Sequence, residues 1–410
     1  MKKILLCLCL CLSVPCLAVT NNCGVDDLSL CQLAEQGDAV AQSNLGRMYL
    51  TGKGVKQDNL AAARWYQKAA EQGHARAQLN LGWMYEAGKG VKQDYLAAAR
   101  WYQKAAEQGY APAQLMIGLM YVNGQGVKQD YKTAVMWLKK AAEQDHALAQ
   151  YNLGVMYTNG QGVKQNDETA VKWYQKAAEQ GYVKAQYNLG VMYENGQGVK
   201  QDYQTAVKWY QKAAEQDHAL AQYNLGVMYM NGLGVKQDYQ TAIKWYQKAA
   251  EQGLPEAQFN LGVMYEDGHG VKQDNLAAAR WYQKAAEQGV AQAQGELGWM
   301  YENGYGVKQD YQTAVKWYQK AAEQDYAAAQ FNLGMMCFNG KGVKKDMKVA
   351  VAWFKEAAER GDGKAQVMLG VMYEYGQGVR KDKYLAKQFY GDACDNGLPV
   401  GCEMHQRLNK

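Results

Sequence analysis

The stretch Ala147-Leu-Ala-Gln-Tyr-Asn-Leu-Gly-Val-Met-Tyr157, followed by Thr158-Asn-Gly-Gln-Gly-Val-Lys164, decides the fold of this chain. Close copies of it recur every 36 residues, ten times without insertion, and each copy carries the glycine found here at Gly154. Self-similarity at a period of this size is the signature of a repeat solenoid, in which each unit buries its apolar face only against its neighbours. The sequence therefore predicts an all-α solenoid of ten helix-turn-helix repeats. A long binding surface, rather than a catalytic pocket, is therefore the expected functional feature.

The first helix of each repeat is predicted from residues that are four apart. Ala149, Leu153 and Tyr157 line up on one helix face, and the glycines after Asn159 supply the positive φ that a helix end and tight turn require. The mature chain has three prolines, and all of them fall in the first turn predicted for a first helix, where a missing N–H costs least: Pro112, Pro255 and Pro399.

The second helix of each repeat begins after an acid or an amide, both of which are good N-caps. These residues are Asp58, Asp94, Asp130, Asn166, Asp202, Asp238, Asp274, Asp310, Asp346 and Asp382. The buried stripe of the second helix is predicted at Ala206, Trp209 and Ala213 and their equivalents. Seven second helices end at a glycine and the other three at Asp145, Asp217 and Asp325, which suits a left-handed position because Asp adopts it more readily than most residues.

The repeat motif Ala-x-Ala-Gln-x-x-Leu-Gly-x-x-Tyr-x-x-Gly-x-Gly-Val-x-x-Asp-x-x-x-Ala-x-x-Trp-x-x-x-Ala-Ala-x-x-Gly resembles the Sel1-like repeat, a relative of the tetratricopeptide repeat. The resemblance covers residues 39–398. It implies a right-handed α/α superhelix whose first helices line the concave side, and an adaptor that assembles other proteins. Secreted bacterial members often mediate contact with a host. Residues 19–38 are then expected to form a capping half-repeat and residues 399–410 a capping helix.

The N-terminus has the composition of a secretory signal peptide. Two lysines precede an apolar stretch, and small residues end at Ala18, so residues 1–18 are expected to be removed. A lipoprotein anchor at Cys16 is the competing interpretation, but the preceding Pro15 suits it poorly. No later apolar run approaches the ~20 residues of a membrane span. The chain is therefore predicted to be exported, either to the periplasm or outside the cell.

The cysteines of the mature chain fit an oxidising compartment. Cys394 replaces a repeat alanine and Cys402 a repeat glutamine, at positions that pack together across the turn between helices, so a bridge between them is predicted. This segment also resembles the bridged unit of the cysteine-rich secreted Sel1-repeat proteins. Cys23 and Cys31 have the same spacing but match no repeat position, and for them a bridge and free thiols both remain open. Cys337 replaces a repeat tyrosine and is predicted to be a buried thiol.

A cell-wall enzyme is the alternative function, because some cysteine-rich relatives are linked to penicillin binding and β-lactam hydrolysis. Such an enzyme needs a serine with a nearby base, often as Ser-x-x-Lys, and the two serines of the mature chain, Ser29 and Ser43, lack this lysine. The histidines are isolated by a repeat or more, which disfavours a metal site. A formal charge of only +5 without a basic run disfavours nucleic acid. We therefore predict a non-catalytic protein without cofactor or metal, a monomer that binds a protein or peptide.

The predicted partner-binding surface follows the variable positions of the first helices, because the second helices are almost copied from repeat to repeat. One position carries an aromatic residue, the position four residues on lies on the same face, and an asparagine adjoins the first. The residues chosen are Tyr151, Asn152, Val155, Tyr187, Asn188, Val191, Tyr223, Asn224, Val227, Phe259, Asn260 and Val263. In the competing interpretation this stripe packs between helices, and the asparagines only tie neighbouring repeats together.

Overall fold

The computed structural model describes residues 28–408, and these form 22 helices and no strand, which confirms the all-α repeat solenoid. A short helix, α1 (Leu28–Glu35), precedes the repeats and α22 (Pro399–Arg407) follows them. The chain divides into two compact units, Met1–Tyr182 with α1–α9 and Val183–Lys410 with α10–α22. The predicted signal peptide lies outside the described residues.

Each repeat contributes two helices. The first helices are α2 (Ala39–Thr51), α4 (Ala75–Ala87), α6 (Ala111–Asn123), α8 (Ala147–Asn159), α10 (Val183–Asn195), α12 (Ala219–Asn231), α14 (Pro255–Asp267), α16 (Ala291–Asn303), α18 (Ala327–Asn339) and α20 (Gly363–Tyr375). The second helices are α3 (Asn59–Glu71), α5 (Tyr95–Glu107), α7 (Tyr131–Ala142), α9 (Asp167–Glu179), α11 (Tyr203–Ala214), α13 (Tyr239–Glu251), α15 (Asn275–Glu287), α17 (Tyr311–Ala322), α19 (Met347–Glu359) and α21 (Lys383–Asp395).

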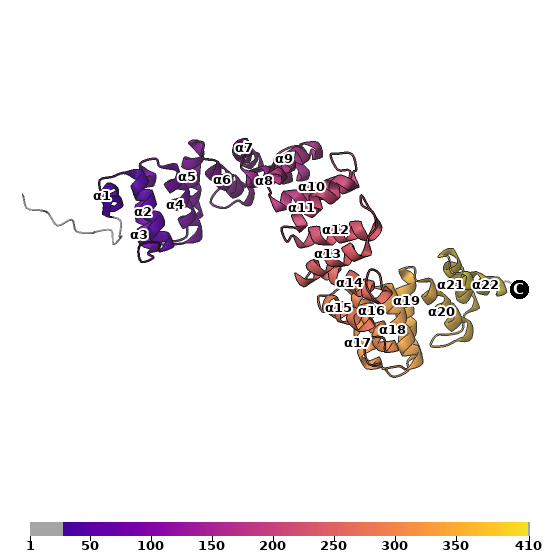
Figure 1. Ribbon diagram of the computed structural model, residues 1–410. Helices are drawn as coiled ribbons and strands as arrows, with labels where there is room; N and C mark the ends of the chain where they lie inside the picture. Colours follow the sequence, from indigo (N-terminus) through magenta and orange to yellow (C-terminus); the bar gives the residue numbers. More distant parts are fainter. Residues whose placement is uncertain (1–27, 409–410) are drawn as a thin grey trace, which may run out of the picture. The chain divides into compact units, whose positions relative to one another are not determined.

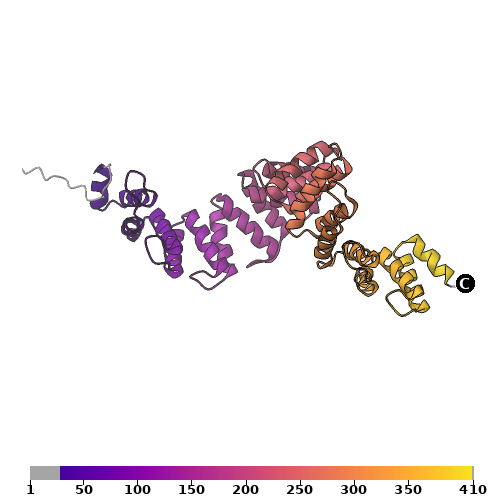
Figure 2. The same cartoon turned by 90° about the horizontal axis from the view of Figure 1, so that it is seen from below.

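Within each unit, a helix packs on the helix before it and the helix after it in the chain (Figures 1 and 2). The element α4, for example, packs against both α3 and α5, and α12 packs against both α11 and α13. Such nearest-neighbour packing is what a chain of identical short helices permits, because each helix can bury its apolar stripe only against the next copy.

The predicted helix boundaries are confirmed by their capping bonds. All ten second helices have the predicted acid or amide as N-cap; Asp238 accepts hydrogen bonds from the amides of Gln240 at 3.0 Å and Thr241 at 3.1 Å. The three prolines lie in the first turns of α6, α14 and α22. Asp145, Asp217 and Asp325 adopt φ of 58°, 60° and 63°, the left-handed conformation expected for them.

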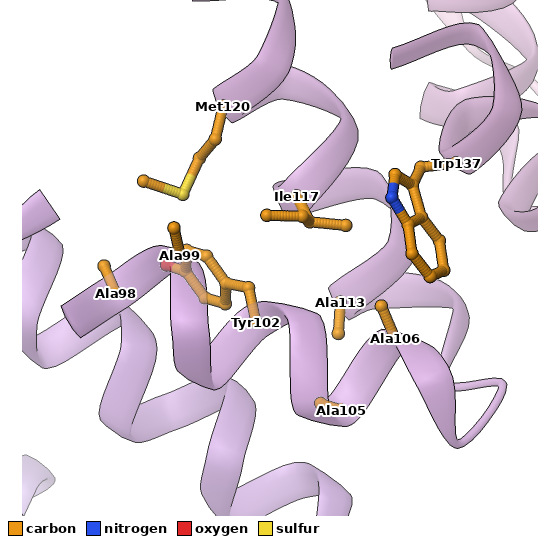
Figure 3. Packing of buried hydrophobic residues seen from close by; sticks show 9 residues of the cluster. All are labelled: Ala98, Ala99, Tyr102, Ala105, Ala106, Ala113, Ile117, Met120 and Trp137. Carbon is orange, nitrogen blue, oxygen red and sulfur yellow. The ribbon is translucent and has the colours of Figure 1, made fainter. Parts of the chain in front are cut away.

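The core of a repeat is built from small residues of both helices around one large side chain of the second helix. In the second repeat, Tyr102 of α5 is fully buried among alanines of its own helix and Ile117 and Met120 of α6 (Figure 3). Its ring lies directly on the backbone at Gly82 of α4, where a Cβ atom would stand 2.7 Å from the ring carbon Cδ1. The repeated glycine therefore exists to let the two helices of one repeat approach each other.

One part of the predicted buried stripe is wrong. Ala206 and Ala213 are buried, but Trp209 is only half-buried and the buried aromatic residue is its neighbour Tyr210. Positions 206, 210 and 213 follow the i, i+4, i+7 spacing of one helix face, and residue 209 lies at its margin. The ammonium nitrogen of Lys212 lies 4.3 Å from the centre of the Trp209 ring. The equivalent tryptophan of the next repeat, Trp245, packs against the core cluster formed by α11 and α12. The tryptophan thus joins one repeat to the next.

A ladder of buried glutamines also joins successive repeats. Gln222 is fully buried in α12; its Nε2 donates to the carbonyl oxygen of Ala214 at 3.0 Å, and its Oε1 accepts from Nε2 of Gln252 at 2.8 Å. The equivalent bond spans 30 residues at eight other places. It is interrupted where Arg360 replaces the donor glutamine, and Oε1 of the buried Gln330 has no partner there. The ladder satisfies polar groups at the junction of three helices.

The substitution Gln222→Leu is expected to lower the free energy of unfolding by about 2 kcal/mol. It keeps a side chain of similar size but removes the hydrogen bond to the carbonyl oxygen of Ala214 and the one from Gln252, each worth about 1 kcal/mol. Urea denaturation measures the loss. The matched control Gln252→Ala removes only the second bond, as Arg360 does in the natural chain, and is expected to cost about half as much. Equal stability of Gln222→Leu and the unmodified protein would contradict a structural role for the ladder.

The cysteines lie mainly at the ends of the described chain. Cys394 in α21 and Cys402 in α22 form a disulfide, with their Cα atoms 4.6 Å apart. Cys31 in α1 is disulfide-bonded as well, and Cys23, its predicted partner, lies outside the described residues. Among the described cysteines, Cys337 is free and buried, and burial raises the pKa of its thiol. This places Cys337 as a small core residue rather than a reactive one.

Candidate functional site

The candidate site is the face of the first helices that carries the variable positions. All twelve predicted partner-binding residues are half-buried: none is fully enclosed and none stands free in solvent. The repeat positions between them, such as Leu225 and Gly226, are buried in the core. Within each compact unit the face is therefore an outer surface of the packed helices, built on a closely packed floor.

The aromatic residues of this face rest on the buried tyrosines of the second helices. The ring centres of Tyr223 and Tyr246 are 5.7 Å apart, and those of Phe259 and Tyr282 are 5.6 Å apart. The same contact occurs at Tyr151 with Tyr174 (5.8 Å) and at Tyr187 with Tyr210 (5.9 Å). Each aromatic residue is thus partly a core residue and partly a surface residue. This result lies between the two interpretations of the sequence, a partner-binding surface and a stripe that packs between helices.

A second ring covers two of these aromatic residues. His218 stacks on Tyr187 with ring centres 4.8 Å apart, and Tyr182 packs on Tyr151 at 5.0 Å. These covering residues stand at the starts of the following first helices. Tyr223 and Phe259 have leucine or valine at the equivalent position, Leu254 and Val290, and no such stacking is found for them among the described residues.

The asparagines of the face bond inside the array. Burial raises the pKa of Tyr187, and a hydrogen bond with Asn224 of the next repeat lowers it in part. Asn260 is bonded in the same way to Tyr223, while Nδ2 of Asn152 donates to the carbonyl oxygen of Leu148 in its own helix at 2.7 Å. These contacts are the ones expected if the asparagines tie repeats and helices together.

A cavity of about 280 Å³ opens on this face between α12 and α14. Four of the predicted residues line it, together with side chains from the end of α12 and from the core: Tyr223, Val227, Met230, Asn231, Tyr246, Asn260, Val263 and Met264. Met230 and Asn231 were not among the predicted residues, although the position of Met230 varies between repeats and both lie at the end of the same helix. Valine and methionine side chains line the cavity together with two tyrosines and two asparagines, and none of the lining residues is charged.

A second cavity on the same face has a different chemical character. It has a volume of about 250 Å³ and lies between α14, α16 and α18 in repeats seven to nine. Two carboxylates and two aromatic rings line it, and its residues are Glu266, Gly295, Glu296, Trp299, Tyr326, Ala328, Ala329 and Asn332. The indole of Trp299 is 37% exposed and stacks on Tyr305 with ring centres 4.9 Å apart.

The carboxylates of this second cavity repel each other. Burial raises the pKa of Glu296, and the negative charge of Glu266 raises it further. Glu266 itself accepts a hydrogen bond from the hydroxyl of Tyr282 at 2.6 Å. Burial raises the pKa of Tyr326, as does the charge of Glu296. A negative potential therefore fills a pocket from which water is partly excluded.

The described residues hold no group of three or more His, Cys, Asp or Glu side chains that could bind a metal ion. Within that same part of the chain, no helix has the length and apolar character needed to cross a membrane. Ser43, one of the two serines considered above as a nucleophile, is buried in α2.

Comparison with known proteins identifies the repeat. The family model described as Sel1 repeat matches ten consecutive segments: 39–74, 75–110, 111–146, 147–182, 183–218, 219–254, 255–290, 291–326, 327–362 and 363–398. The search of curated proteins found no match.

Solved structures resemble the chain over most of its length. One is a protective antigen present in uropathogenic Escherichia coli strains that displays an SLR fold; the two are 38% identical, the match covers 93% of this chain and 90% of that one, and the TM-score is 0.69. Another is a Sel1 repeat protein from Oxalobacter formigenes, at 38% identity, 75% and 89% coverage and a TM-score of 0.60.

Proposed function

The chain belongs to the Sel1 repeat family, and from this premise we propose that it is an exported, non-catalytic scaffold that binds a protein or peptide along the face of its first helices. The observation that carries the proposal is the cavity between α12 and α14, which brings together Tyr223, Val227, Asn260 and Val263. Half-buried aromatic residues around a concave apolar site are the usual anchors of a partner side chain.

The composition of the face supports a protein partner rather than a small molecule. The cavity is open and lies in a row of similar half-buried aromatic and apolar positions, one set per repeat, within residues 183–290. A repeated surface of this kind suits an extended segment that makes the same contact several times. Because the floor under it is rigid, little ordering entropy is lost when a partner binds.

Export is proposed from the signal-like N-terminus and from the terminal disulfide. A disulfide between Cys394 and Cys402 persists in an oxidising compartment and not in a reducing cytosol. One similar protein is a protective antigen of uropathogenic Escherichia coli, which supports contact with a host as the setting. Envelope assembly is the other setting in which the same scaffold would act.

The double substitution Tyr187→Leu with Tyr223→Leu tests the proposal. Leucine keeps apolar contact with Tyr210 and Tyr246 but removes the flat ring and the hydroxyl. We therefore expect a stability cost of about 1 kcal/mol per site and at least a ten-fold loss of partner capture from envelope extracts, since a central aromatic anchor contributes ~2 kcal/mol. Capture is measured per folded molecule, with melting recorded on the same preparation.

The matched control is Tyr384→Ala, which removes an aromatic side chain that is 71% exposed on α21. It is expected to leave capture unchanged. Full capture by the folded double variant would contradict binding through this face. A labelled penicillin added to the same preparations tests the enzyme alternative, and stoichiometric covalent labelling would replace the scaffold with a penicillin-binding protein.

A further inference from the structure

Repeat eight departs from both of its neighbours at three positions on one face of α16. Gly295 stands where the adjacent repeats have phenylalanine, and Glu296 stands where they have asparagine. Trp299 replaces their valine or methionine. One change removes a ring from the binding face, one adds a charge, and one adds a large exposed ring. Together they produce the acidic cavity of repeats seven to nine.

Gly295 makes room for the ring of Tyr326, which lines this cavity. A Cβ atom at residue 295 would stand 2.7 Å from ring carbon Cε1 of Tyr326, so the ring lies directly over the helix backbone. In repeat four, Tyr151 and Tyr182 occupy the two equivalent positions, and their ring centres are 5.0 Å apart. Repeat eight therefore has one ring where repeat four has two, and this ring, Tyr326, lines the open volume of about 250 Å³.

The charge of the cavity is unfavourable unless a cation enters it. Glu296 and Glu266 face the same partly desolvated space, and like charges in such a space repel each other more strongly than in water. The lining residues, all of them in the described part of the chain, include no basic side chain. The adjacent repeats avoid this arrangement by having asparagine at the position of Glu296.

The walls of the cavity suit a flat cation. Trp299 is held in place by its stack on Tyr305, and Tyr326 is the second aromatic residue that lines the cavity. Aromatic faces attract cations, and a guanidinium group can lie flat on a ring while its fork of N–H donors reaches carboxylates. An ammonium group is a compact point charge and cannot make both contacts equally well.

We propose that this cavity receives an arginine side chain of the bound partner. The proposal rests on the proposed function for its biological role and adds to it the chemistry of one partner residue. The guanidinium group lies between the rings of Trp299 and Tyr326 and donates to Glu266 and Glu296. The partner segment therefore carries a basic residue about two repeats away from the residue that fills the apolar cavity at Tyr223.

The test is a titration of the purified chain with the peptide acetyl-Gly-Gly-Arg-Gly-Gly-amide, followed by the NMR signal of the Trp299 indole N–H. The signal is assigned with Trp299→Phe. We expect saturable binding, and at least ten-fold weaker binding of the same peptide with citrulline, which keeps the shape of arginine but has no charge. Lysine in place of arginine is expected to weaken binding at least three-fold.

The matched variant is Glu296→Asn, which introduces the residue of both adjacent repeats and is expected to weaken the arginine peptide at least ten-fold. Gly295→Phe introduces the neighbours' ring and is expected to abolish binding by displacing the ring of Tyr326, which lines the cavity. If Gly295→Phe does not fold, Glu296→Asn alone decides. Equal affinities for arginine and citrulline, or unchanged affinity in Glu296→Asn, would overturn the proposal.

This experiment separates the cavity from the proposed function. The variant Tyr187→Leu with Tyr223→Leu is expected to bind the arginine peptide normally, because its substitutions lie outside the acidic cavity. If the chain binds the arginine peptide but captures no partner through the face of its first helices, the proposal for the acidic cavity stands and the proposed scaffold function along that face is refuted. If Glu296→Asn captures the partner as well as the unmodified chain does, and the citrulline peptide binds as tightly as the arginine peptide, only the proposal for the acidic cavity is refuted.

Discussion

Replacing Gly306 with alanine is expected to lower the free energy of unfolding by about 4 kcal/mol. Gly306 lies in the turn between α16 and α17 and has a φ of 68°, which costs an alanine about 1–2 kcal/mol. Its Cβ atom would also stand 2.0 Å from the backbone carbonyl oxygen of Asn275, at the start of α15 in the preceding repeat. A backbone atom cannot rotate away as a side chain can. The turn must therefore move away from the start of α15, at a further cost of about 1–3 kcal/mol.

The matched control for this effect is Gly289→Asp. Gly289 has a φ of 94°, but no atom lies within 4 Å of the position its Cβ would take. The chain itself places Asp325 at the equivalent site one repeat later, with a φ of 63°. We expect a cost below about 1 kcal/mol for the control. Urea denaturation measures both variants, and hydrogen exchange is expected to show lost protection in α15 and α16 for Gly306→Ala. Equal stability of the two variants would contradict the contact between repeats.

Removing the disulfide between Cys394 and Cys402 with two serines is expected to cost about 2.5 kcal/mol. The bridge closes a loop of 8 residues, and the entropy of closing such a loop in the unfolded chain corresponds to about that free energy. The effect is local, because among the described helices α22 packs chiefly against α21. Hydrogen exchange of α21 and α22 and peptide mapping under non-reducing conditions check it.

The repeat provides a stringent control for the disulfide. In the other repeats these two positions carry alanine and glutamine, and the glutamine donates to the carbonyl oxygen eight residues before it, as Gln222 does to Ala214. Cys394→Ala with Cys402→Gln can therefore rebuild one bond of the ladder and is expected to recover about 1 kcal/mol relative to the serine variant. Full stability of the serine variant would show that the bridge contributes nothing to this end of the chain.

The parts of the fold that depend on local sequence could be predicted. An N-cap such as Asp238 acts on amides two and three residues away, and the left-handed conformation of Asp217 is a property of that residue and its turn. The buried aromatic residue of the second helix was assigned wrongly because Trp209 and Tyr210 adjoin each other. Which of the two faces the core depends on how the helix is rotated against Gly190, where a Cβ would stand 2.6 Å from the Tyr210 ring.

The site could be predicted only in outline. Variation among the first helices indicated the right kind of surface, but the degree of exposure of Tyr187 depends on His218 and Tyr210, which come from other helices. The acidic cavity depends on Tyr326, which lies 31 residues after Gly295 and reaches back over it. The unusual sequence of α16 was visible, but the space it opens was not, because that space is defined by the next repeat.

The glutamine ladder has a mechanical consequence. Each ladder bond that spans 30 residues among the described residues joins two positions of the same repeat. The bond that crosses between repeats, such as that from Gln222 to the carbonyl oxygen of Ala214, reaches only the preceding repeat. A chain pulled at its two ends would then yield one repeat at a time, and each step would release 36 residues, or about 120 Å of contour length. The loop closed by the disulfide between α21 and α22 cannot lengthen in this way. Because the other repeats unfold one at a time, a pulling force would extend the chain in many small, recoverable steps rather than in one rupture.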